Sequence, residues 1–231
     1  MQTDEQGPTT QAGHGLDWRA GGVPVSRRFG DPFFSLEGGL AETGHVFHHG
    51  NDLASRLCDG FRIAETGFGT GLNLLATVAL WRGLGRPGGI TFTSFEAFPL
   101  SPEEMARAHA ALPGLADLST QLLDLWGQGA RAFTLGGLRV RVIEGDARLT
   151  LPAWDGRADA WFLDGFAPAR NPELWSDVLM VEVARHTAPG GSFATYTAAG
   201  AVRRSLQAAG FVVERVPGFG RKRHMTRGYL P

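Results

Sequence analysis

The chain has 231 residues, a formal net charge of −1 and one cysteine. This charge excludes nucleic-acid binding through bulk charge alone, and a lone cysteine excludes both an intrachain disulfide and a metal site built from several thiolates. The longest apolar run, residues 74–81, is too short to cross a bilayer, and residues 1–20 lack the apolar segment of a secretory signal. We therefore expect a cytoplasmic protein that makes no membrane contact.

The N-terminal part of the chain divides into two segments. Residues 1–20 are rich in Gln, Thr and Gly, and we expect them to form a flexible tail. Residues 21–60 mix aromatic residues with Gly, Pro and Asp, which predicts short strands and turns rather than helices. We interpret them as a small N-terminal extension of one domain that spans residues 21–231 and has its core in residues 61–231.

From residue 61 onward, apolar strands alternate with helical patterns. Strands are predicted at residues 61–65, 90–96, 138–144, 158–164 and 191–197. Helices are predicted at residues 70–82, 101–112, 171–186 and 198–210, with Ser101 and Asn171 as the N-caps of the second and third. Residues 131–135 are expected to form a hairpin with 138–144, and 211–216 an antiparallel pair with 224–230. The pattern predicts an α/β fold with a mostly parallel, seven-stranded, doubly wound sheet and an antiparallel edge strand.

A glycine-rich loop joins the first strand of this core to the first helix. Its sequence, ETGFGTGLN at residues 65–73, has three glycines at alternate positions, which allow sharp turns and close approach of a ligand. The spacing departs from the G-x-G-x-x-G of dinucleotide folds, and the leading Glu65 is a poor neighbour for a pyrophosphate. It suits an amino group, such as that at the amino-acid end of S-adenosylmethionine. The alternative is a tight strand–helix turn without a ligand.

Two more acids follow the next two strands. Glu96 ends the strand 90–96, where a carboxylate can hydrogen-bond a ribose diol. Asp146 follows the strand 138–144 and can accept a hydrogen bond from an adenine amino group, or can cap the helix that comes after it. Together with Glu65, these acids predict one adenosine-bearing ligand spread across the edge of the sheet.

Asp164 ends the fourth such strand, within WFLDGFAPARNPELW at residues 161–175. A carboxylate beside the reactive end of the ligand can orient a nucleophilic amine and accept its proton. Phe166 and Pro168 are placed to exclude water from that site. The alternative is that Asp164 caps its own loop.

Two weaker patterns remain. His45, His48 and His49 lie close together, but without an accompanying ligand set we expect surface or packing roles rather than a metal site. The run GRKRHMTR at residues 220–227 is the most concentrated basic segment of the chain and can bind phosphate.

Several segments together are similar to one known family. They are RFGDPFFS, VFHHGNDL, ETGFGTGLNLL, FTSFEAFPLSPEE, VIEGDARLTLP, WFLDGFAPARNPELW and GFGRKRHM, and over about residues 24–230 they resemble the MnmC/MnmD family of tRNA wobble-uridine methyltransferases. The resemblance implies a class I Rossmann-like methyltransferase that uses S-adenosylmethionine and no metal. Its implied reaction converts the aminomethyl group of 5-aminomethyl-(2-thio)uridine into a methylaminomethyl group. The implied partners are tRNA and a separate or fused FAD-dependent oxidoreductase.

The resemblance also implies roles for individual residues, and Asp164 becomes the catalytic residue. The implied cofactor contacts are Glu65, Gly67, Phe68, Gly69, Thr70, Gly71, Asn73, Glu96, Asp146 and Ala147. The implied substrate contacts are Phe33, Asn51, Phe166, Lys222 and Arg223. Gly30 and Phe33 depart from the family pattern, which more often has Asp and Tyr at these positions.

Three other functions remain open at this point. A small-molecule amine N-methyltransferase would suit the near-neutral charge but not the family motifs. An NAD-dependent dehydrogenase is disfavoured by the glycine spacing. A non-catalytic module that binds S-adenosylmethionine is disfavoured by Asp164 and by the complete glycine loop.

Overall fold

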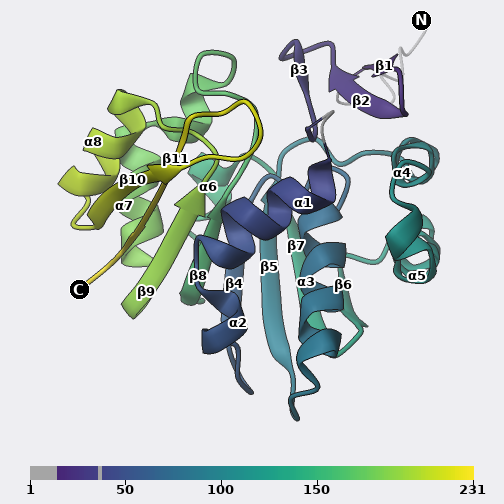
Figure 1. Cartoon of the computed structure of the whole chain (residues 1–231), viewed down its shortest axis with the longest axis horizontal. Helices are drawn as coiled ribbons and strands as arrows, with labels where there is room; N and C mark the ends of the chain where they lie inside the picture. The colour runs from purple at the N-terminus through teal and green to yellow at the C-terminus, as the bar shows by residue number, and fades with distance from the viewer. Residues whose placement is uncertain (1–14, 36–37) are drawn as a thin grey trace, which may run out of the picture.

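The computed structural model describes residues 15–35 and 38–231, so the first fourteen residues of the predicted tail lie outside it. Its core is an eight-stranded sheet with strand order β10-β11-β9-β8-β4-β5-β7-β6 (Figure 1). The strands are β4 (Arg62–Thr66), β5 (Ile90–Glu96), β6 (Ala132–Leu135), β7 (Leu138–Glu144), β8 (Ala158–Leu163), β9 (Thr187–Thr195), β10 (Val212–Pro217) and β11 (His224–Tyr229).

The sheet is parallel in its centre and antiparallel at both edges. β9, β8, β4, β5 and β7 pair in parallel, whereas β11 runs antiparallel to both β9 and β10. This confirms the mostly parallel, doubly wound sheet. The sheet has eight strands rather than the seven expected. The hairpin predicted at residues 131–144 is confirmed, because β6 pairs antiparallel with β7. Gly136 and Gly137 join the two strands at φ values of 57° and 93°, a conformation that favours a tight hairpin turn.

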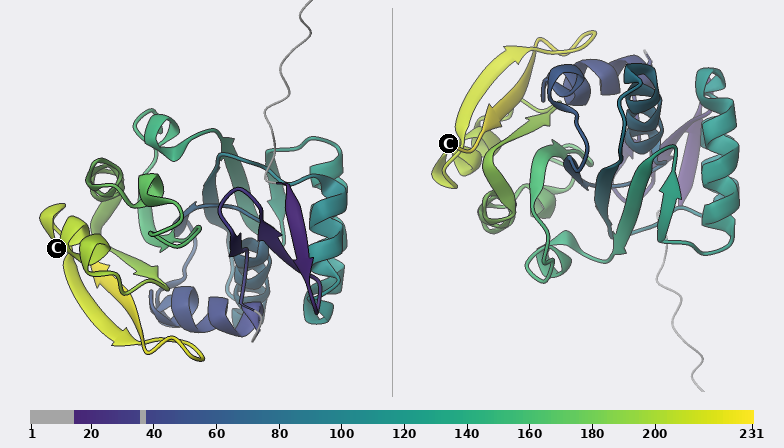
Figure 2. Two further views of the ribbon diagram at one scale, coloured as in Figure 1. Left: turned by 90° about the horizontal axis from the view of Figure 1, so that it is seen from above. Right: turned by 90° about the horizontal axis from the view of Figure 1, so that it is seen from below.

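Helices cover both faces of the sheet (Figure 2). One buried cluster joins the sheet to α3 (Leu72–Leu84), α4 (Pro102–His109), α5 (Ala116–Gly127) and the helical segments before β4. A second joins the other face to α6 (Ala147–Thr150), α7 (Asp177–Arg185) and α8 (Gly200–Ala208). Within the described ranges, no helix is long and apolar enough to cross a membrane.

The N-cap predicted at Ser101 is confirmed. The Ser101 side chain accepts a hydrogen bond from the Glu104 backbone N–H, and the Glu104 carboxylate accepts one from the Ser101 N–H at 2.9 Å. This reciprocal pair satisfies two donors that would otherwise lack partners at the start of α4.

The N-terminal extension differs from its prediction. Residues 39–56, expected as strands and turns, form α1 (Gly39–Thr43), a π-helical segment η1 (Gly44–His49) and α2 (Leu53–Arg56). Val46, Leu53 and Leu57 are buried at helical spacing, and a side chain at Gly50 would clash with Ala194. This stretch therefore has a helical apolar face, which its histidines and glycines conceal in the sequence.

The start of the chain also differs from its prediction. Residues 16–19, assigned to the tail, form β1 (Leu16–Arg19), which pairs with β2 (Val23–Ser26). β3 (Asp31–Pro32) completes a small three-stranded sheet, which Figure 1 shows above the carboxyl ends of the central strands.

The helix predicted at 171–186 is interrupted. Residues Pro172–Trp175 form a 3-10 turn, η3, and α7 begins only after Ser176, whose backbone is extended. Asn171 makes no side-chain capping hydrogen bond. The interruption turns Trp175 into the core, where its indole N–H donates to the Phe166 carbonyl at 2.9 Å. The break thus anchors the loop that follows Asp164.

Candidate active site

A cavity of about 480 Å³ lies at the carboxyl ends of β4, β5 and β8. Its size is within the range of small-molecule sites, about 300–1,000 Å³. On the side of the sheet it is lined by the glycine loop, Glu96 and Asp164. On the opposite side it is lined by residues 29–35, α1 and the loop before β11. The strand ends on which the sequence analysis placed a ligand therefore do border one cavity.

The glycine loop takes a conformation that other residues rarely adopt. Gly67, Gly69 and Gly71 have φ values of 83°, 53° and 76°. A Cβ atom at Gly67 would lie 3.4 Å from Gly165 Cα, and one at Gly69 would lie 3.1 Å from Phe33 Cδ1. The loop is thus packed between the Asp164 loop and the N-terminal extension. Gly67 and Gly69 line the cavity with Phe68 and Thr70, whereas Gly71 starts α3 behind them.

His109 fixes the far side of this loop. Its Nε2 lies 2.7 Å from the Thr70 carbonyl, and its Nδ1 lies 2.7 Å from the Ser119 hydroxyl. Burial lowers the pKa of His109, which favours the neutral ring. Helices α4 and α5 thereby hold the glycine loop in place.

Glu65 lies behind the cavity rather than on its surface. The residue is 1% exposed, and its carboxylate accepts hydrogen bonds from Asn73 Nδ2 at 2.8 Å and from the Ser94 hydroxyl at 2.6 Å. Burial raises the pKa of Glu65 well above its usual value, although these two hydrogen bonds oppose the rise. Glu65 therefore affects the cavity indirectly, by orienting the Asn73 amide, which also binds Asp164.

Asn73 joins two carboxylates. Its Nδ2 also donates to Asp164 Oδ2 at 2.8 Å, while its Oδ1 accepts from the Thr43 hydroxyl at 2.7 Å. The amide group is therefore fully oriented by the protein, with both donors on acids and its acceptor on a hydroxyl. The position of the Asp164 carboxylate is coupled in this way to the first turn of α3.

Glu96 faces the cavity from the end of β5. One carboxylate oxygen accepts from Gly69 N–H at 2.9 Å, and the other accepts from Phe98 N–H at 2.7 Å. Burial raises the pKa of Glu96, and these backbone hydrogen bonds limit the rise. Because Glu96 lines the cavity, its carboxylate is placed to accept hydroxyl groups of a ligand.

Asp164 is held at the centre of the cavity wall. Its Oδ1 accepts from Gly165 N–H at 2.8 Å, and Oδ2 accepts from Asn73. Burial raises the pKa of Asp164 to about 6, against the effect of these two hydrogen bonds. A carboxylate with this pKa is largely ionised at neutral pH and is still a useful proton acceptor.

Asp146 and Ala147 are placed differently from each other. Ala147 lines the cavity, but Asp146 is not among the described residues that do. The Asp146 carboxylate caps α6 by accepting from Arg148 N–H at 2.9 Å and forms an ion pair with the Arg148 side chain. The capping role, left open by the sequence, is thus the arrangement observed.

Aromatic side chains form the opposite wall. The Phe166 ring stacks on Phe29, with ring centroids 4.6 Å apart, and meets Phe33 edge-on at 5.1 Å. Asp31 fixes this wall to the Asp164 loop, because its carboxylate accepts from Ala167 N–H at 2.8 Å. Phe33 and Phe166, which were expected to contact substrate, therefore both border the cavity.

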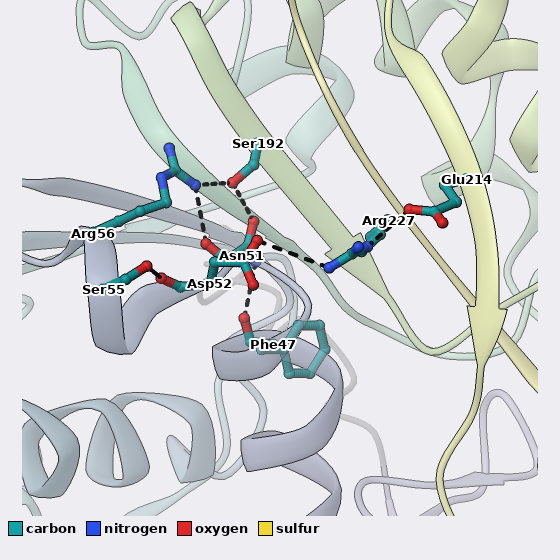
Figure 3. Close-up of polar contacts among 8 residues, drawn as sticks. All are labelled: Phe47, Asn51, Asp52, Ser55, Arg56, Ser192, Glu214 and Arg227. Carbon is teal, nitrogen blue, oxygen red and sulfur yellow. Dashed lines mark hydrogen bonds and ion pairs between the residues drawn. The ribbon is translucent and has the colours of Figure 1, made fainter.

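Asn51, by contrast, is turned away from the cavity and packs inside the protein. The residue is 1% exposed and donates to the carbonyls of Phe47 and Trp161 at 3.0 and 3.2 Å. Figure 3 shows its side chain between Phe47 and Ser192, whose hydroxyl donates to Asn51 Oδ1. The amide thus holds η1 on β8 and β9. Its expected substrate contact would require breaking this network.

Only one of the two basic residues predicted to contact substrate lines the cavity. Lys222 lines the cavity, and its Nζ lies 2.7 Å from Glu42 Oε1. Arg223 is exposed beside it and is outside the described lining of the cavity.

Several polar residues that were not predicted as site residues also line the cavity, namely Asp31, Ser35, Glu42, Thr43, Asn171, Tyr196 and Arg221. Tyr196 directly follows β9, whereas the strand predicted from the sequence ran on to residue 197, so the strand-end rule did not indicate it. Glu42 lies in α1, where the same rule does not apply. The histidines of the extension make packing contacts: His48 Nε2 lies 3.2 Å from the Thr77 hydroxyl, and His45 Nε2 lies 3.1 Å from the Pro217 carbonyl.

Comparison with known proteins identifies the family. A family model described as S-adenosyl-L-methionine-dependent methyltransferase matches residues 113–231, just over half of the chain. The tRNA 5-methylaminomethyl-2-thiouridine biosynthesis bifunctional protein MnmC of Pseudomonas aeruginosa is 48% identical over 224 residues, which cover 92% of this chain and 34% of that protein. The protein of the same name from Chromobacterium violaceum is 46% identical over 226 residues, with coverages of 93% and 34%.

A solved structure agrees with these relatives. The crystal structure of MNMC2 from Aquifex aeolicus aligns with a TM-score of 0.76 and 26% identity, over 96% of this chain and 72% of that one. The chain spans about a third of the length of the curated relatives it matches. The dehydrogenase interpretation is not retained. The chain belongs to the S-adenosyl-L-methionine-dependent methyltransferase family.

Proposed function

We propose that this protein methylates the exocyclic amine of 5-aminomethyl-(2-thio)uridine at the wobble position of tRNA, giving the 5-methylaminomethyl form. The observation that carries the proposal is that the Asp164 carboxylate lies on the wall of a cavity that also contains the glycine loop and Glu96. The names of the relatives, which refer to biosynthesis of 5-methylaminomethyl-2-thiouridine in tRNA, support the same substrate.

The residues on the sheet side of the cavity fit S-adenosylmethionine. Gly69 lines the cavity with a φ of 53°, a backbone conformation that glycine adopts more readily than other residues. We assign Glu96 to the ribose hydroxyls, because its carboxylate lines the cavity beside the glycine loop at the end of β5. Gly67, Phe68, Thr70 and Ala147 complete this part of the cavity, with Glu65 acting through Asn73.

When bound, S-adenosylmethionine supplies an activated methyl group. The acceptor nitrogen needs a free lone pair, so its ammonium form must lose a proton. Asp164 is suited to accept this proton, because its pKa is raised to about 6 by burial while its position is fixed by Asn73 and Gly165. Phe166 and Phe33 limit the access of water to this point.

The partners of the protein and its location form part of the same proposal. The curated relatives are named bifunctional, and this chain corresponds to about a third of their length. We assign the precursor-forming step to an FAD-dependent oxidoreductase, fused or separate, and the place of reaction to the cytoplasm. Arg223 and its basic neighbours are the proposed contacts to tRNA phosphates.

A methyl-transfer assay with labelled S-adenosylmethionine tests the proposal. Three acceptors are compared: tRNA with 5-aminomethyluridine at the wobble position, the same tRNA without the modification, and the free nucleoside. Label in the modified tRNA alone supports the proposal. Equal label in the free nucleoside would identify a small-molecule amine methyltransferase, and no label in any acceptor would exclude the proposed activity.

A further inference from the structure

Three polar residues of the cavity come from elements outside the glycine loop and the Asp164 loop. Glu42 comes from α1, Tyr196 follows β9, and Lys222 lies in the loop between β10 and β11. These segments are far apart in the sequence, yet all three residues line the same cavity as Asp164. They form a compact group, which we call the Glu42–Tyr196–Lys222 cluster.

The cluster already holds a cation. The Lys222 ammonium lies 2.7 Å from Glu42 Oε1 and 4.2 Å from the centroid of the Tyr196 ring. A carboxylate on one side and an aromatic face on another are the two kinds of group that attract an ammonium ion most strongly in proteins. Glu42 and Tyr196 therefore have the geometry of a binding site for an ammonium group, and the Lys222 side chain occupies it.

The acceptor groups of this site are fixed, whereas the occupant is mobile. The Glu42 side chain is only 13% exposed, and the Tyr196 hydroxyl donates to the Gly165 carbonyl at 2.8 Å. The backbone of Lys222 is held in a turn by a hydrogen bond to the Phe219 carbonyl at 3.0 Å. Its side chain, however, is 46% exposed and has four flexible bonds, so the ammonium can leave without movement of the turn.

The cluster is electrostatically part of the reaction site. The charge of Glu42 adds to the burial that raises the pKa of Asp164, and the charge of Lys222 lowers it. Burial raises the pKa of Tyr196, and the charges of Asp164, Asp31 and Glu42 raise it further. Asp31, Glu42 and Asp164 line the cavity together with Lys222 and Arg221. A cation that replaced the Lys222 ammonium would meet the same attraction to Glu42.

We propose that Glu42 and the face of Tyr196 form the subsite for the substrate's aminomethyl group in its ammonium form, and that Lys222 occupies this subsite until substrate displaces it. The inference rests on the proposed function, since it assigns the residues that recognise the amine before Asp164 accepts its proton. It predicts selection for a positively charged group at this position of the base. A neutral group of the same size cannot replace Lys222 on Glu42 without leaving a buried carboxylate unpaired.

Two RNA ligands separate this recognition from binding of the rest of the RNA. One is an anticodon stem–loop with 5-aminomethyluridine at the wobble position, and the other carries 5-hydroxymethyluridine, which is similar in size but uncharged. The measured quantity is the ratio of their dissociation constants. Because both ligands share every phosphate, this ratio cancels the contribution of backbone contacts.

Glu42→Gln is the decisive variant. It should reduce the preference for the aminomethyl ligand roughly ten- to a hundredfold, as expected for loss of a charge-assisted hydrogen bond. Affinity for the hydroxymethyl ligand and for S-adenosylmethionine should stay within about twofold. Glu214→Gln is the matched control, because Glu214 is exposed, pairs with Arg227 and lies outside the cavity lining. It should leave the ratio unchanged.

Lys222→Met tests the displacement. Without the internal cation the preference for the aminomethyl ligand should increase, even if both ligands bind more weakly because a phosphate contact is lost. A decreased preference would overturn the proposed role of Lys222. If Glu42→Gln fails to fold, Glu42→Asp replaces it, because this variant keeps the charge but shortens the side chain. Its preference for the aminomethyl ligand should be weaker than that of the wild type but should not be abolished.

The outcomes also distinguish this inference from the proposed function. If the wild-type protein methylates the aminomethyl RNA and Glu42→Gln retains the full preference for it, the subsite assignment alone is wrong. If the wild type neither methylates nor prefers the aminomethyl RNA, the proposed function and the subsite are both excluded.

Discussion

The two sides of the cavity are built in different ways. The cofactor side consists of strand ends and the loop that enters α3, and its acids are buried and hydrogen-bonded: Glu65 is 1% exposed and Glu96 is 7% exposed. The acceptor side is assembled from the N-terminal extension, the residue after β9 and the loop before β11. Its polar contacts include an ion pair whose lysine side chain is 46% exposed.

This difference suits two different ligands. A site for a constant cofactor gains from rigid donors and acceptors, because ordering them during binding would reduce affinity. Under the proposed function the other side admits one base of a large RNA, which needs groups that can move aside, and the proposed exchange of Lys222 on aromatic walls provides them. Asp164 lies where the two sides meet, connected to the first through Asn73 and facing the second.

The largest effect is expected on the rigid side, from Gly69→Val. The residue has a φ of 53°, which costs a β-branched side chain about 1–2 kcal/mol, and its Cβ would lie 3.1 Å from Phe33. Binding of S-adenosylmethionine, measured by calorimetry, should fall below detection. Gly83→Ala, at a helical position with open space around it, is the control and should bind normally. Wild-type affinity in the valine variant would show that the loop does not hold the cofactor.

The second prediction concerns pH and the meeting point of the two sides. Burial raises the pKa of Asp164 from 3.8 to about 6, so the ionised carboxylate is lost as the pH falls through 6. The value of kcat/KM for the aminomethyl RNA should therefore decrease about tenfold per pH unit below 6 and be level just above it. A pH–rate profile at saturating S-adenosylmethionine measures this. A rate that stays level down to pH 5 would contradict proton acceptance by Asp164.

A smaller effect on methyl transfer is expected from Asn73→Ala, which removes the hydrogen bond between Asn73 and Asp164. The hydrogen bond from Asn73 holds the pKa of Asp164 down, so its loss should move the acidic limb of the pH–rate profile to higher pH. Stability should fall by about 1–3 kcal/mol, because Glu65 also loses a donor. Thr43→Val is the control, since it removes only the hydrogen bond to Asn73 Oδ1. An unchanged limb in the alanine variant would argue that Asn73 does not tune Asp164.

The smallest effect is expected on the outer rim of the acceptor side. Arg223→Ala should weaken tRNA binding a few-fold and reduce the slope of log K against log salt by about 0.9, the value for one phosphate contact. Arg139→Ala, at an exposed position of β7 remote from the cavity lining, should leave the slope unchanged. If both variants behave alike, the RNA contacts lie elsewhere.

The same difference explains how much could be predicted from the sequence. The parallel core and the cofactor side follow from local patterns, because each apolar strand is followed directly by its glycine or acid, as at Gly67, Glu96 and Asp164. The local pattern was ambiguous at Asp146, where a cap and a ligand contact require the same residue type. The helix break at Ser176 was missed because Asn171-Pro172 is a strong start signal that tertiary packing of Trp175 overrides.

The acceptor side could not be predicted in this way. No pattern within α1 indicates that Glu42 meets a lysine 180 positions later, since that contact exists only when the whole chain has folded. Other elements did carry a signal that was not used. Leu118, Leu122 and Trp126 are spaced at helical intervals and are buried in α5, for which no helix was predicted. Asn51 was expected in the site, but its polar groups are all used to hold η1 on the sheet.

The most direct test of the central claim compares Asp164→Asn with the wild type on the aminomethyl anticodon stem–loop. Single-turnover methyl transfer should fall by about two to four orders of magnitude, as for loss of a positioned proton acceptor. Affinity for S-adenosylmethionine should stay within a few-fold, and the melting temperature within about 4 °C, because the change is isosteric. Full activity of this variant would contradict the account, since the carboxylate at the meeting point of the two sides would then have no role in the reaction.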